Sequence, residues 1–125
     1  MKLLWYADSL SYKLHQCSMS GLVYSHYAMG ALPKGHYKIL GLRNINVKDE
    51  YENPETVKYH ILPSDSFDES VFSADELRIL NRVVDKFKYM KVTEIVEYMH
   101  QETAYVETQP DELISYELAK EIRAF

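Results

Sequence analysis

Histidine, tyrosine, glycine and lysine side chains gather in residues 21–40, where the chain reads GLVYSHYAMGALPKGHYKIL. Such residues can bind a metal, move a proton, cradle a phosphate or recognise a partner protein. Residues 30–35 imitate a phosphate-binding loop, but His36 stands where that motif requires lysine. Pro33 also removes one of the backbone N–H groups that would hold the phosphate. A phosphate site is therefore not predicted.

The histidines do not predict a metal centre or a catalytic centre. None of the five lies three or four residues from another, whereas zinc sites usually contain such close ligand pairs. Glu97 and His100 match half of a di-iron motif, which needs a second copy and further glutamates. Cys17 has no recognisable nucleophile motif around it. We predict no metal, no cofactor and no enzymatic activity, with a metal enzyme built on His26, His36 and Glu97 as the weaker alternative.

Tyrosine is the abundant residue type, at 11 of 125 residues. Its side chain offers a large contact area with few rotatable bonds and a polar tip, which suits recognition surfaces. Tyr24, Tyr27 and Tyr37 accompany Met29, whose flexible side chain adapts to varied partners. Any single tyrosine fits a core position with a bonded hydroxyl better, but the cluster favours recognition over catalysis.

Apolar periodicity predicts the elements that position these residues. Apolar residues at steps of three and four indicate helices over residues 2–15, 73–89, 92–102 and 115–123. The clearest end signal is FSADEL, in which Ser73 caps a helix and Glu76 completes a capping box. Residues 22–28 favour a short strand, after which Pro33 fits the first position of a helix that stops near Gly41. Residues 44–50 and 56–62 alternate around Asn53-Pro54, which predicts an antiparallel hairpin with one buried face.

Length and composition bound the class of protein. A chain of 125 residues, 46% hydrophobic and 26% charged, is predicted to form one α+β domain over residues 1–125, mainly helical with a small antiparallel sheet. A single cysteine excludes an internal disulfide and favours the reducing cytoplasm. No apolar run reaches the roughly 18 residues that span a bilayer. The first helical pattern begins without a cap, which suggests that N-terminal residues of a longer chain are missing.

The net charge of −5 is placed unevenly along the chain. Residues 1–90 are balanced, and residues 91–125 carry the whole acidic excess. An acidic surface repels nucleic-acid phosphates and favours basic partners, so we predict weak DNA affinity for this chain alone.

Five blocks of the sequence are similar to those of a known family. They read KLLWYADSLSYK, SGLVYSHYAMGALPKGH, FSADELRILNRVVDKF, KVTEIVEYMHQE and ISYELAKEIRAF. Together they resemble the SocA-like antitoxin domain, also called Panacea and earlier described as a phage-associated GepA-like protein. The resemblance covers nearly the whole chain, and the W-Y-A-D block and the Met-Gly turn are its most specific parts.

The resemblance implies a mainly helical α+β antitoxin encoded beside a toxin gene, often on a prophage. Members of the family neutralise a toxin by direct binding and pair one scaffold with many unrelated toxin folds. Family members carry residues before the W-Y-A-D helix, which agrees with the uncapped start. The alternatives are a DNA-binding regulator of the operon and an adaptor that delivers the toxin to a protease. A homo-oligomer is compatible with each of these roles.

The strand-turn-helix stretch is predicted to be the recognition surface. The predicted partner-binding residues are Tyr24, His26, Lys34 and Tyr37. Strand alternation places Tyr24 and His26 on one face and Tyr27 and Met29 on the other, and we favour the first pair as the exposed one. The alternative is that the acidic C-terminal helices contact the toxin. Gly30 is predicted to adopt a backbone conformation that a β-carbon would strain.

Overall fold

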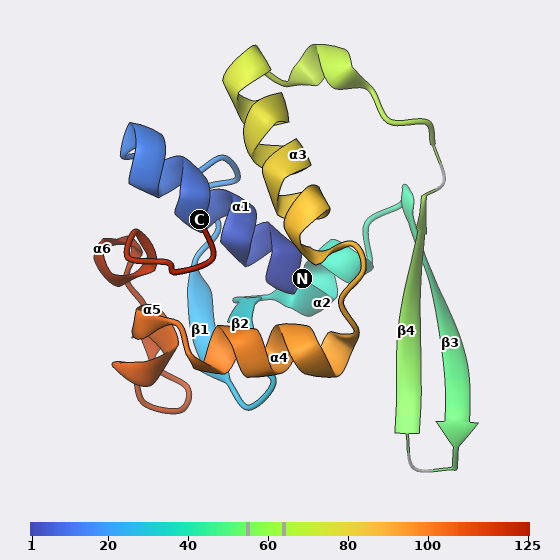
Figure 1. Cartoon of the computed structure of the whole chain (residues 1–125). Coiled ribbons are helices and arrows are strands. Elements are labelled where there is room, and N and C mark those ends of the chain that lie inside the picture. Colours follow the sequence, from blue (N-terminus) through green and yellow to red (C-terminus); the bar gives the residue numbers. More distant parts are fainter. Residues whose placement is uncertain (55, 64) are drawn as a thin grey trace. The chain divides into compact units, whose positions relative to one another are not determined.

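The computed structural model describes residues 1–54, 56–63 and 65–125. Helices and small antiparallel sheets make the chain a mainly helical α+β protein, as predicted (Figure 1). The chain divides into two compact units, which are described separately. Unit 1 combines residues 1–34 with residues 70–125, and unit 2 consists of residues 35–69. The prediction of a single domain over the whole chain stays a prediction.

Unit 1 consists of helices around a small antiparallel sheet. Its elements are α1 (Lys2–His15), β1 (Tyr24–Tyr27), β2 (Gly30–Pro33), α3 (Ala74–Phe87), α4 (Val92–His100), α5 (Thr103–Val106), β5 (Leu113–Ile114) and α6 (Tyr116–Ala119). A short 3-10 helix, η1 (Glu69–Val71), precedes α3. The sheet has the order β2-β1-β5, so β1 is its central strand and both neighbours run antiparallel to it. Strand β5 thus returns from the C-terminal part of the chain to a strand near its start.

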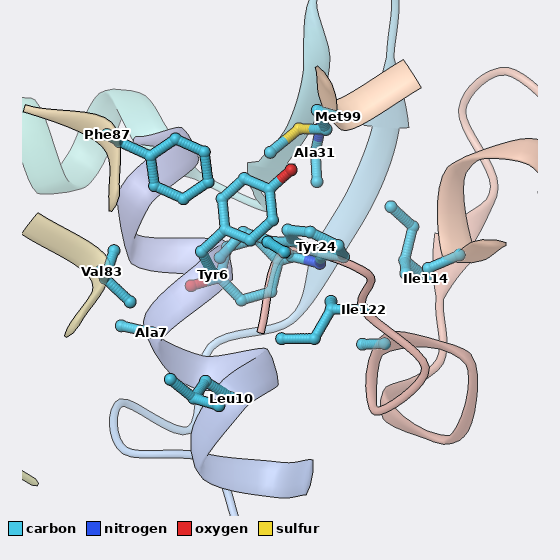
Figure 2. Packing of buried hydrophobic residues seen from close by; sticks show 14 of the residues in the cluster. Tyr6, Ala7, Leu10, Tyr24, Ala31, Val83, Phe87, Met99, Ile114 and Ile122 are labelled. Atoms are coloured by element: carbon cyan, nitrogen blue, oxygen red, sulfur yellow. The ribbon is translucent and has the colours of Figure 1, made fainter. Parts of the chain in front are cut away.

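The core of unit 1 lies where α1, α3 and the sheet meet. Trp5, Tyr6 and Leu10 come from one face of α1, and all three are almost fully buried. Figure 2 shows the Tyr6 ring beside Phe87 of α3, and the two ring centroids are 4.5 Å apart. The same apolar cluster also contains Tyr24, Ala31, Met99, Ile114 and Ile122, which come from the strands, α4 and the C-terminal segment.

Helix α3 begins as its capping signal predicts. The Ser73 N–H donates to Glu76 Oε2 at 2.8 Å, and the Glu76 N–H donates to Ser73 Oγ at 3.2 Å. Both bonds of the capping box are therefore present, and two N–H groups at the start of the helix have partners. The buried face of α3 carries Ile79, Val83 and Phe87. Val84, next to Val83 on the same helix, is 49% exposed.

Unit 2 contains α2 (His36–Leu40) and a hairpin of β3 (Ile45–Asn53) and β4 (Thr56–Pro63). The predicted antiparallel hairpin is confirmed, with Val47 paired to Ile61. The buried face expected of it is not found at Ile61, which is 51% exposed, whereas Ile45 and Val47 are half-buried. Among the described residues of this unit the sheet has two strands, too few to bury a face by themselves. The side chains of residues 57 and 59, also expected on that face, lie outside the described ones.

Two predicted helices differ from those of the structure. Pro33 ends β2 instead of starting a helix, and Gly35 at φ 71° precedes α2, which begins at His36. The predicted C-terminal helix over residues 115–123 is limited to α6, a single turn. The two-residue strand β5 and the short helix α5 were not predicted. No helix in the described ranges combines the length and the apolar character that a bilayer crossing requires.

Candidate partner-binding surface

Tyr24 of β1 lies in the core, so the exposure predicted for it is wrong. Its side chain is 1% exposed, and its hydroxyl donates to Asp8 Oδ2 at 2.6 Å. Asp8 is itself fully buried in α1 and also accepts the backbone N–H and the hydroxyl of Ser20. Burial raises the pKa of Tyr24 far above its ordinary value, and the bond to Asp8 adds to this effect. Tyr24 therefore anchors β1 to α1 and cannot contact a partner.

His26 is half-buried and is held by residues from the C-terminal part of the chain. Its ring stacks on Tyr105 with 3.7 Å between ring centroids, and its Nδ1 lies 2.9 Å from Thr108 Oγ1. The Thr108 hydroxyl donates to the Ala104 carbonyl at 2.7 Å, so the proton shared with His26 must reside on Nδ1. His100 stacks on the same tyrosine, with 4.6 Å between centroids. His26 thus belongs to a stack of three rings.

The same tyrosine and histidine fix the turn between β1 and β2. The Tyr105 hydroxyl donates to the Tyr27 carbonyl at 2.5 Å, and His100 Nε2 donates to the Ala28 carbonyl at 3.1 Å. Met29 follows at the tip of this turn and is 55% exposed. Among Tyr24, His26, Tyr27 and Met29, the most exposed side chain is therefore that of Met29.

Gly30 has the restricted backbone that the sequence predicts. Its φ is +116°, a conformation that residues with a side chain rarely adopt, and a β-carbon there would overlap Met99 Sδ. The same sulfur lies 3.0 Å from the Ala31 N–H, which donates to it. The turn and α4 therefore approach each other as closely as a glycine allows.

Lys34 and Tyr37, the two other predicted contact residues, are both exposed but lie in different units. The Lys34 N–H donates to the Val23 carbonyl at 2.8 Å and extends the β1–β2 ladder by one bond. Tyr37 is 66% exposed on α2 of unit 2. Their role in binding stays a prediction.

Sequence spacing did not identify the residues that hold the turn. Tyr105, His100 and Thr108 lie more than seventy positions after the residues that they contact. No local pattern reports a contact over that separation. The composition gave a partial signal, since tyrosine accounts for 11 of the 125 residues.

A second buried carboxylate, that of Glu102, accepts hydrogen bonds from α1 and from the C-terminal segment. Its Oε1 accepts the Tyr6 hydroxyl at 3.2 Å, and its Oε2 accepts the Arg123 N–H at 2.7 Å. Glu102 is 1% exposed, and this burial raises the pKa of its carboxyl group. A cleft beside it is lined by Tyr98, Gln101, Glu102 and Arg123. The bonded groups are backbone and core groups, so this arrangement serves the fold.

The arrangement of acidic and imidazole groups offers no metal cage in the part of the chain that is described. Among those residues, no three histidine, cysteine, aspartate or glutamate side chains lie close enough to hold a metal ion. The absence of a cofactor stays a prediction. Exposed acidic side chains instead line the C-terminal segment. Glu117 pairs with Lys120, and this ion pair lowers the pKa of the Glu117 carboxyl group.

Similarity to known proteins spans most of the chain. Residues 1–105 match the family model described as antitoxin SocA-like, Panacea domain. No curated protein and no solved structure matches the chain. The matched range includes the W-Y-A-D block in α1 and the turn between β1 and β2, and it ends before β5. The resemblance inferred from the sequence blocks is thereby confirmed.

Proposed function

Because the chain belongs to the family of SocA-like antitoxins with a Panacea domain, we propose that it neutralises a toxin protein by binding it directly. The observation that carries the proposal is the family match, which spans residues 1–105. The geometry supports it, since the family's Met-Gly turn is held by side chains from two helices and presents Met29 to solvent. A rigid scaffold with an exposed, adaptable side chain suits protein recognition.

The proposed mechanism is occlusion of the toxin's functional surface, and it places the protein in the cytoplasm beside its toxin. Lys34 and Tyr37 remain our proposed contacts, each on the exposed part of its unit. His26 would act by supporting the turn, because its ring is stacked and bonded within the protein. The acidic excess of residues 91–125 favours a toxin with a basic surface, as expected of toxins that act on nucleic acids.

The test begins with the reading frame next to this gene. We expect that its product arrests growth when expressed alone and that co-expression of this chain restores growth. Purified toxin and antitoxin should then form a complex that lacks toxin activity in the absence of any protease. Neutralisation that requires a protease would identify an adaptor instead. Tight, salt-sensitive binding of operator DNA by residues 1–125 would favour the regulator.

Variants of the proposed contacts give a second test. Tyr37→Ala and Lys34→Ala should weaken toxin binding, whereas Tyr89→Ala should not, although Tyr89 is 89% exposed. Circular dichroism must show that each variant is folded. If both variants protect cells fully while charge reversals at Glu117 and Glu121 abolish protection, the toxin contacts the acidic C-terminal segment instead.

A further inference from the structure

Two exposed basic side chains of α3 lie over aromatic rings at the edge of the core of unit 1. The Arg82 guanidinium carbon is 5.5 Å from the centroid of the Phe125 ring, and Lys86 Nζ is 5.2 Å from that of Tyr98. Both rings pack edge-on against the buried Phe87, with 6.1 and 6.0 Å between ring centroids. Because a cation is attracted to the face of an aromatic ring, these contacts keep the two cationic groups at defined places on the surface.

A third cation, Arg123 of the C-terminal segment, lies close to the same rings. It lines a cleft of about 160 Å³ together with Tyr98, Gln101 and Glu102. Its Nη1 donates to the Gln101 carbonyl at 3.3 Å, which holds the exposed guanidinium group beside this cleft. Glu102 accepts the Tyr6 hydroxyl and the Arg123 N–H, but it forms no ion pair with the Arg123 guanidinium group.

These three residues, Arg82, Lys86 and Arg123, which we call the basic cluster, form no ion pair with a carboxylate in the part of the chain that the structure describes. Three other basic side chains of unit 1 do form one with an acid three residues away, in the pairs Arg78–Asp75, Lys88–Asp85 and Lys120–Glu117. Within the cluster, Arg82 and Lys86 are four residues apart on α3, and like charges at this spacing destabilise a helix. Exposed positive charge that is kept at a cost to the fold is typical of a binding site.

We propose that the basic cluster binds an acidic segment of a partner protein, whose carboxylates pair with the two guanidinium groups and with Lys86 Nζ. This inference goes beyond the antitoxin function proposed above and does not depend on it. A guanidinium group binds a carboxylate through two parallel N–H bonds. The Arg82 guanidinium makes no hydrogen bond within the described residues, so its donors are available for such a pair. Because the chain has a net charge of −5, this local positive charge fixes the place and the orientation of an acidic partner.

The same residues favour a protein over a nucleic acid. Bases stack on open aromatic faces, whereas Lys86 and Arg82 cover one face of the Tyr98 ring and of the Phe125 ring, respectively. Nucleic-acid affinity also grows with the number of phosphates that a protein neutralises. Three cations in a chain of net charge −5 supply few such contacts.

The test uses the full chain and a fluorescently labelled octaglutamate peptide, with binding followed by fluorescence anisotropy. The wild type should bind the peptide at low salt, and high salt should weaken the binding. The double variant Arg82→Gln and Lys86→Gln should bind about ten-fold more weakly, because two exposed ion pairs with the peptide are lost. The control is the double variant Arg78→Gln and Lys120→Gln, which removes the same formal charge at two side chains that are already paired. It should bind like the wild type.

A variant outside α3 keeps the test decisive if the double variant disturbs that helix. Arg123→Gln retains the N–H that Glu102 accepts and removes the guanidinium charge. Its affinity for octaglutamate should fall several-fold. Arg123→Lys should recover part of this loss, because it restores the charge without the planar fork. Circular dichroism checks that each variant is folded.

The outcomes distinguish between possible occupants of the site. Absence of peptide binding by the wild type, or equal losses for the two double variants, would refute the proposed site. Tighter binding of an oligothymidylate than of octaglutamate, lost in the same cluster variants, would identify a nucleic-acid site instead. If the wild type sediments as a dimer that the cluster variants dissociate, the acidic segment belongs to a second copy of this chain and not to another protein.

Discussion

Gly30 combines a positive φ with a close neighbour, two constraints that a comparison with Gly21 can separate. A side chain at this position requires both a φ of +116° and space that Met99 Sδ occupies. Gly30→Ala should therefore lower the free energy of unfolding by more than about 2 kcal/mol, from backbone strain and overpacking together. Gly21→Ala is the matched control, since its φ is +71° but nothing lies within 4 Å of the added carbon. Urea unfolding measures both, and equal losses would contradict the overlap with Met99.

The hydroxyl of Tyr24 should matter more to stability than that of Tyr12. Both donate to a carboxylate, but the Tyr24–Asp8 bond is buried and the Tyr12–Glu117 bond is exposed. Tyr24→Phe leaves a buried carboxylate with one donor fewer and should cost about 1–3 kcal/mol. Tyr12→Phe should change stability much less, because water replaces the lost donor. Thermal unfolding of the two variants decides the comparison.

Glu102 should make stability depend on pH. The folded protein holds the Glu102 proton to a higher pH than the unfolded chain, whose carboxyl has an ordinary pKa of 4.5. The folded state therefore binds more protons in this window, and the free energy of unfolding falls as pH rises from 4.5 through the raised pKa. Glu102→Gln removes this dependence. As pH rises, the free energy of unfolding of the wild type should fall relative to that of the variant. Parallel pH profiles of the two proteins would contradict a raised pKa.

At the scale of single residues, the sequence predicted backbone conformation better than it predicted which side chains are buried. The unusual backbone of Gly30 followed from its place in a turn-forming stretch. The side of the strand that Tyr24 faces did not, because alternation fixes which residues share a face but not which face is buried. That choice depends on Asp8 of α1 and Ile114 of β5, which are distant in sequence.

At the scale of elements, α3 depends on its capping box. Ser73→Ala removes the acceptor of the Glu76 N–H and should cost about 1 kcal/mol. Ser66→Ala, an exposed serine outside any helix or strand, should cost nothing measurable. Circular dichroism during urea titration reports both values. A change at Ser73 with no effect would mean that water caps the helix equally well.

Elements with a long periodic pattern were predicted well, and short ones were not. Helix α1 has the predicted bounds, because its apolar positions recur over several turns. Strand β5 has two residues, which carry no periodicity, and its existence depends on pairing with β1. Pro33 satisfied a rule for helix starts, but its ring is equally compatible with the end of the edge strand β2.

At the scale of the molecule, unit 1 should not fold from residues 1–105 alone. That range matches the family model, yet Ile114, Ala119 and Ile122 belong to the core cluster, and all three lie beyond it. A chain ending at residue 105 also lacks β5 and the Arg123 N–H that Glu102 accepts. We expect it to lack a cooperative thermal transition that residues 1–125 show in calorimetry. A cooperative transition of the shorter chain would mean that unit 1 folds without residues 106–125.

The position of β5 also limits when unit 1 can complete its fold during synthesis. The ribosome releases α1, β1 and β2 first, but β5, the second partner of β1, is translated only after α5. Until then Tyr24 and its neighbours lack the cover of Ile114, so the nascent chain is open to chaperones and proteases. The fold of unit 1 is therefore complete only after β5 has left the ribosome. A ribosome that stalls before β5 would therefore yield a chain in which β1 lacks its second partner and which is open to degradation.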